Sequence, residues 1–111
     1  MLNESIAYQQ GRLGCHGVSL PEIADACGTP VYVYSLPRLR ANYERIRQAF
    51  AGLDAHIHYS AKANGNLAVL TALINAGAGI DAVSGGEIHR ALAAGADPVR
   101  IVFAGVGKTV P

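Results

Sequence analysis

One lysine at the end of a short apolar segment is the residue best placed for covalent chemistry. Residues 55–61 alternate in polarity around Ile57 and Tyr59, which indicates a strand, and Lys62 follows among small residues. Burial there would disfavour the ammonium form, so more of the amine would be free to attack an aldehyde. The small neighbours would also leave room for a flat ring. The same pattern is typical of a solvated lysine at a turn, so the surrounding elements must decide between the two interpretations.

The elements that must position this lysine alternate between strands and helices along the second half of the chain. Helical spacing of apolar residues follows the first strand, and a glycine suited to a helix C-terminus follows each helix. Such alternation indicates βαβ units and a parallel sheet, hence an α/β fold. We expect, in order, a strand over 55–61, a helix over 67–76, a strand over 79–83, a helix over 86–94 and a strand over 101–103.

The first third of the chain shows a different pattern. Ser19 and Glu22 fit a capping box at the start of a helix, and Gly28 and Pro30 break that helix. Residues 1–34 therefore look like a separate subregion, whose strand need not join the parallel sheet. We expect here a helix over 20–27 and a strand over 31–34, followed by a longer helix over 36–50.

Composition limits the classes of protein to which the chain can belong. Its 111 residues are 50% hydrophobic and 15% charged, which is enough apolar material for a folded core. A net charge of +1 without a basic tail argues against nucleic-acid binding. No segment reaches the ~18 continuous apolar residues of a membrane span. Cys15 and Cys27 do not form a CxxC pair, so we expect free thiols and a cytoplasmic protein.

Two further motifs resemble a nucleotide-binding loop and a metal site, but their spacing supports neither. The stretch Gly105–Thr109 lacks the first glycine of a P-loop, because Val102 stands at that position. His56 and His58 would share one strand face, but no third residue has suitable spacing for a metal ligand. We therefore expect neither a nucleotide nor a metal.

A second group of residues should lie at the same edge of the sheet as Lys62. Asp81 falls late in the second strand, and Ser84 and Glu87 form a capping box at the start of the next helix. In parallel α/β folds the C-terminal ends of the strands and the loops that follow them form the active face. Lys62, Asp81 and the loop 104–109 would then face one mouth.

Four segments carry a family resemblance in their order and spacing: Ala24–Tyr34, Tyr59–Leu70, Asp81–Gly95 and Ile101–Thr109. The chain resembles the diaminopimelate decarboxylases over nearly its whole length from about residue 18. The segment around Lys62 is similar to the one that attaches pyridoxal 5′-phosphate in that family. Ser60 and Gly65 are minor departures, at positions where other small or hydrophobic residues are common.

The resemblance implies an enzyme that depends on pyridoxal 5′-phosphate and decarboxylates meso-2,6-diaminopimelate, a small amino acid, to L-lysine. It implies a (β/α)8 barrel that carries the cofactor at its C-terminal face, with residues 35–111 as its first βα units. Residues 1–34 would belong with a β-rich second domain, and a homodimer would complete the site. Lys62 would hold the cofactor covalently, and Asp81 would lie near it.

The expected sheet is incomplete, because three strands cannot close a barrel that typically needs about 250 residues. We therefore expect the chain to be part of a longer protein and to be inactive as a decarboxylase by itself. The resemblance places the phosphate-binding loops and the partner-subunit residues beyond Pro111. Another decarboxylase of the same fold, acting on ornithine, arginine or carboxynorspermidine, is one alternative. A relative of alanine racemase, a non-catalytic pyridoxal phosphate-binding protein and an α/β interaction module without a cofactor are the others.

Overall fold

The computed structural model describes residues 5–108, which form two compact units. The first unit ends at Arg38 and the second begins at Leu39, inside helix α2 (Leu36–Ala49). Each unit has its own sheet, antiparallel in the first and parallel in the second.

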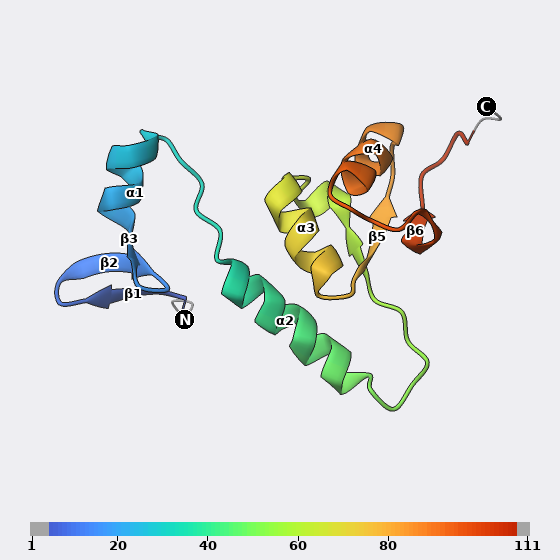
Figure 1. Cartoon of the computed structure of the whole chain (residues 1–111), viewed down its shortest axis with the longest axis horizontal. Helices are drawn as coiled ribbons and strands as arrows, with labels where there is room; N and C mark the ends of the chain where they lie inside the picture. The colour runs from blue at the N-terminus through green and yellow to red at the C-terminus, as the bar shows by residue number, and fades with distance from the viewer. Residues whose placement is uncertain (1–4, 109–111) are drawn as a thin grey trace. The chain divides into compact units, whose positions relative to one another are not determined.

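The first unit is built on a small antiparallel sheet that the sequence analysis did not predict. Strands β1 (Ile6–Gln9), β2 (Arg12–Cys15) and β3 (Val18–Ser19) lie in that order, and helix α1 (Leu20–Cys27) follows directly (Figure 1). Gln10 and Gly11 connect β1 to β2 with φ angles of 51° and 78°. Two consecutive residues with positive φ are typical of the tightest β-hairpin turns. The bounds of α1 agree with the predicted helix over 20–27.

The predicted strand over 31–34 is wrong. Its β-branched and aromatic composition favours an extended backbone, but these residues have no strand assignment in the structure. A strand needs a neighbouring strand to accept its backbone hydrogen bonds, and composition does not supply one. Tyr32 and Tyr34 instead stack on each other, with ring centroids 6.4 Å apart, and both are exposed.

The second unit contains the predicted parallel sheet. The predicted helix starts and strand ends agree with the structure to within a few residues, except that the first strand is shorter than 55–61. The strands pair in the order β4, β5, β6, each parallel to the next. After α2, the elements are β4 (His58–Ser60), the 3₁₀ turn η1 (Ala61–Ala63), α3 (Leu67–Asn75), β5 (Gly79–Ala82), α4 (Gly85–Ala93), the 3₁₀ turn η2 (Pro98–Arg100) and β6 (Ile101–Phe103).

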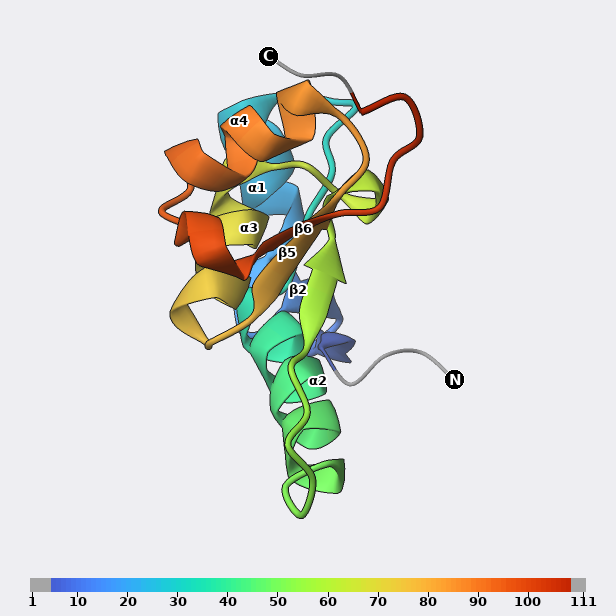
Figure 2. The same ribbon diagram turned by 90° about the vertical axis from the view of Figure 1, so that its right-hand side faces the viewer.

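The core of this unit lies between the sheet and helices α3 and α4, which cover one of its faces (Figure 2). Ile80 from β5 is fully buried against Leu70 from α3 and Ala91 from α4. A second cluster joins Tyr43 from α2 to Leu73 from α3. Since side chains alternate along a strand, the residues on either side of Ile80 point to the face without these helices.

Among residues 5–108, no helix combines the length and the apolar character needed to cross a membrane. Both cysteines are free thiols, Cys15 buried and Cys27 exposed. The same residues include no group of three His, Cys, Asp or Glu side chains that could hold a metal ion.

Candidate functional site

Lys62 lies in turn η1, immediately beyond the last paired residue of β4. The structure corrects one expectation here, because Lys62 is exposed rather than poorly solvated. The turn leaves the plane of the sheet after Ser60, so that Ala61 points into the core and Lys62 points into solvent. The amine is thus within reach of a dissolved ligand at the C-terminal edge of the sheet.

The segment that follows Lys62 is held by several hydrogen bonds. Asn64 accepts a bond from the backbone N–H of Asn66 through its side chain (3.0 Å), and Asn66 in turn caps helix α3. The hydroxyl of Tyr59 donates to the carbonyl of Asn64 (3.4 Å). Arg90 on α4 donates to the carbonyl of Gly65 (3.0 Å). These contacts tie the lysine-bearing turn to β4, α3 and α4.

Asp81 lies beside Ser60 on the neighbouring strand. The two residues are partners in the β4–β5 register, and the Ser60 hydroxyl donates to Oδ2 of Asp81 at 3.1 Å. The other carboxylate oxygen, Oδ1, is buried and has no hydrogen-bond partner among the described residues. Buried acceptors in folded proteins are usually hydrogen-bonded, so this oxygen keeps the capacity to accept a further donor.

His58 packs on the same face, one step below this pair. Its ring covers Gly79, where a Cβ atom would lie only 2.6 Å from Nε2 of His58 and 2.8 Å from the carbonyl oxygen of Arg100. Glycine is therefore required at the start of β5. The predicted pairing of His56 with His58 on one strand face is wrong, because His56 precedes β4 and lies in an exposed loop near Asp54.

Ser84 and Glu87 act as the predicted helix cap, with one difference. The Ser84 hydroxyl accepts the backbone N–H of Glu87 at 3.2 Å, as a capping box requires. The return bond is shifted by one residue, since Oε2 of Glu87 accepts the N–H of Val83 at 2.8 Å rather than that of Ser84. Glu87 thus stabilises the β5–α4 junction.

The loop after β6 folds against the end of β5. Ala104 donates its N–H to the carbonyl of Ala82 at 3.0 Å. A Cβ atom at Gly105 would lie 2.8 Å from the carbonyl oxygen of Val83, so only glycine fits there. Lys108 places its amine 5.7 Å from the ring centroid of Phe103, within the range of a cation–π contact. The described part of the predicted 104–109 loop therefore lies at the same edge as Lys62 and Asp81, while Thr109 falls outside the described residues.

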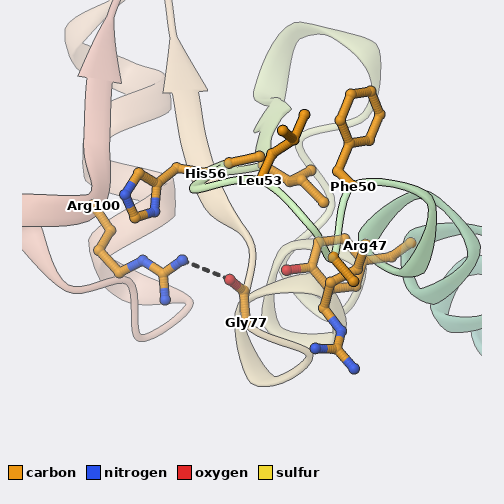
Figure 3. Close-up of a pocket in the computed structure, with 10 residues that line it drawn as sticks. Arg47, Phe50, Leu53, His56, Gly77 and Arg100 are labelled. Atoms are coloured by element: carbon orange, nitrogen blue, oxygen red, sulfur yellow. Dashed lines mark hydrogen bonds between the residues drawn. The ribbon is translucent and has the colours of Figure 1, made fainter.

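A pocket of about 340 Å³ lies elsewhere, at the opposite end of the same sheet (Figure 3). It is lined by residues that precede the strands, among them His56, Gly77 and Arg100, and it includes neither Lys62 nor Asp81. Arg100 donates to the carbonyl of Gly77 at 2.6 Å across this pocket. Near its rim, a hydrogen bond from Arg47 holds the pKa of Glu44 below its usual value.

The residues at the C-terminal edge are able to hold a ligand that carries an aldehyde. Lys62 offers a primary amine for covalent attachment, and Asp81 offers an unsatisfied acceptor at the end of the neighbouring strand. The sequence analysis missed Ser60 and Arg90 as parts of this arrangement. The position of Ser60, two residues before Lys62, was a usable signal, but its partner became identifiable only once the β4–β5 register was known.

Comparison with known proteins assigns the chain to a family. Residues 36–111 match the family described as the pyridoxal-dependent decarboxylase, pyridoxal binding domain. The chain is 46% identical to the diaminopimelate decarboxylase of Pseudomonas aeruginosa over 106 residues, and 49% identical to that of Aquifex aeolicus over 107 residues. These alignments cover 96% of the chain but only 26% and 25% of the two relatives.

Solved structures give the same result. A crystallised Aquifex aeolicus protein superposes with a TM-score of 0.89 at 48% identity, covering 96% of the chain and 26% of that protein. The diaminopimelate decarboxylase of M. jannaschii, crystallised with L-lysine, superposes with a TM-score of 0.89 at 36% identity and with the same coverage. The chain spans about a quarter of the length of these relatives. Since the family match covers most of its residues, the chain belongs to the pyridoxal-dependent decarboxylases and carries part of their pyridoxal-binding domain.

Proposed function

We propose that this chain forms the first part of a decarboxylase that converts meso-2,6-diaminopimelate to L-lysine with pyridoxal 5′-phosphate as its cofactor. The observation that carries the proposal is the position of Lys62, an exposed amine on the turn just beyond β4. The relatives named diaminopimelate decarboxylase, with 44% to 49% identity, support the choice of substrate. When bound, pyridoxal phosphate supplies the electron sink for loss of CO₂.

In this proposal the chain's own residues attach and orient the ligand. The Lys62 amine holds the cofactor covalently, and the hydrogen bonds around Asn64 and Gly65 keep the lysine-bearing turn in place. Asp81 offers its free oxygen, Oδ1, to a donor on the ligand. The glycine at position 105 lets the loop after β6 approach the end of β5 closely.

We also propose how this site fits into the whole protein. Residues 35–111 begin a (β/α)8 barrel, and residues 1–34 associate with a β-rich second domain, which the antiparallel strands β1 to β3 support. We propose a cytoplasmic homodimer whose partner subunit completes the site. The 111-residue chain alone is then inactive as a decarboxylase, because most of the barrel is missing from it.

A related decarboxylase acting on another amino acid is the second candidate. The description of the matched family names pyridoxal dependence and decarboxylation but no substrate. Ornithine, arginine and carboxynorspermidine therefore remain the competing substrates. The L-lysine complexes of the M. jannaschii and Helicobacter pylori relatives favour diaminopimelate.

The test uses a completed barrel, in which this chain replaces the matching quarter of the Aquifex aeolicus relative. We expect CO₂ release from meso-2,6-diaminopimelate in preference to the three competing amino acids. Lys62→Ala should lower turnover by at least about a thousandfold, because covalent attachment is lost. Lys108→Ala is the matched control and should leave most of the activity.

Three results would contradict the proposal at different points. Preference for ornithine would refute the substrate, and full activity of Lys62→Ala would refute the attachment site. Turnover by the unmodified 111-residue chain would refute the view that the chain is an incomplete catalytic unit.

A further inference from the structure

We propose that Ser60 is a positioning residue for Asp81 in the bound state of this site. Its hydroxyl fixes Oδ2 of Asp81 and so directs Oδ1 toward a hydrogen-bond donor on the bound pyridoxal ligand. This inference rests on the proposed function.

The geometry of the pair comes from strand register. Ser60 and Asp81 are direct partners across β4 and β5, with the hydroxyl oxygen 3.1 Å from Oδ2. Their neighbours Tyr59 and Ile80 pack into the core beneath α3 and α4, so alternation turns Ser60 and Asp81 to the opposite face. A carboxylate bonded through one oxygen loses most of its freedom to rotate.

The second carboxylate oxygen of Asp81, Oδ1, can still accept a hydrogen bond. Oδ1 is shielded from solvent, and no described residue donates to it. On the same face, β6 places the apolar Val102 next to Asp81, and the His58 ring is packed over Gly79 instead. Leaving a buried acceptor unpaired costs free energy, so a donor from outside these residues would bind there favourably.

A bound ligand is the donor that best fits this position. Asp81 lies near the end of β5, on the edge of the sheet at which Lys62 follows β4, and a ligand attached to Lys62 must lie along that edge. Alanine at position 60 would remove the one hydrogen bond that residues 5–108 make to the Asp81 side chain, and the carboxylate could then turn away from the ligand. A purely structural hydrogen bond between β4 and β5 is the competing explanation.

The experiment measures cofactor affinity and apoprotein stability separately in the completed barrel. Dissociation constants for pyridoxal 5′-phosphate come from absorbance titration, and unfolding of the cofactor-free protein is followed in urea. The variants are Ser60→Ala, Ser60→Thr, Asp81→Ala and the double variant Ser60→Ala with Asp81→Ala. Threonine keeps a hydroxyl at position 60 and is therefore the conservative control.

We expect Ser60→Ala to weaken cofactor binding about 5- to 10-fold, which is the effect of losing one ordinary hydrogen bond. Ser60→Thr should stay within about twofold of the parent. In the Asp81→Ala background, Ser60→Ala should cause no additional loss, because its effect passes through Asp81.

Two results would overturn the inference alone. One is that Ser60→Ala leaves the dissociation constant of pyridoxal 5′-phosphate unchanged and alters only the stability of the cofactor-free protein. That result is expected of a hydrogen bond with a purely structural role. The other is that Ser60→Ala weakens cofactor binding by the same factor whether position 81 is aspartate or alanine. Failure of the parent barrel to bind the cofactor through Lys62 would refute the proposed function itself, and the inference with it.

Discussion

The two ends of the parallel sheet differ in how far their polar groups are already satisfied. At the C-terminal edge, the Lys62 amine is exposed and one oxygen of Asp81 has no described partner. At the opposite end, Arg100 is bonded to a backbone carbonyl at 2.6 Å and Arg47 is paired with Glu44 at 2.7 Å. Only the opposite end contains the pocket drawn in Figure 3. The site that we propose therefore lies at the end with unused bonding capacity, and the pocket lies at the other end.

The topology explains this difference. Strands β4, β5 and β6 are parallel, so the loops that follow them meet at one edge. Helices α3 and α4 also begin at that edge, capped by Asn66 and Ser84. The opposite end receives the helix C-termini and the segments that enter the strands.

The largest effect on stability should come from Gly79→Ala, at the start of β5 and thus at the end opposite Lys62. The new methyl group would lie within 2.8 Å of a backbone oxygen of Arg100 and would displace the His58 ring, so the cost should be about 1–3 kcal/mol in the free energy of unfolding. Gly85→Ala at the C-terminal edge is the matched control, because no atom lies within 4 Å of its added carbon. Urea denaturation of the completed barrel measures both.

Equal destabilisation by the two glycine variants would remove the contrast in packing between the two ends of the sheet. It would mean that the first turn of α4 is as tightly packed as the start of β5. A stable Gly79→Ala protein would mean that the His58 ring can move away without cost.

A smaller effect on stability is expected from Arg100→Gln at the same end of the sheet. Loss of the bond from Arg100 to the Gly77 carbonyl should cost about 0.5–1.5 kcal/mol of unfolding free energy, reduced by the exposure of this side chain. The dissociation constant of pyridoxal 5′-phosphate should not change. If Arg100→Gln weakened cofactor binding as much as Ser60→Ala, the assignment of separate roles to the two ends would be wrong.

Local signals in the sequence predicted the second unit well. The cap at Ser84 and the glycines at 77 and 95 set helix boundaries through interactions within a few residues, and sequence patterns reveal such interactions. The cap at Asn66 was not predicted. The position of Lys62 after the first parallel strand followed from the same patterns.

Features that depend on distant partners were not predictable in this way. The strand expected over 31–34 has the right composition but no partner strand, and the hairpin of β1 and β2 was missed although Gln10 and Gly11 mark its turn. The exposure of Lys62 depends on how η1 leaves the sheet. The bond between Ser60 and Asp81 depends on register, which a shift of one residue would destroy.

The covalent attachment point of the cofactor can be located by chemical trapping. The completed barrel is loaded with pyridoxal 5′-phosphate and reduced with borohydride, and the modified peptides are identified by mass spectrometry. The chain contains two lysines, Lys62 and Lys108, so the second serves as an internal control. We predict a stable modification on Lys62, none on Lys108, and loss of the signal in Lys62→Arg. Modification of Lys108 or of a lysine outside this chain, with Lys62 unmodified, would refute Lys62 as the attachment residue.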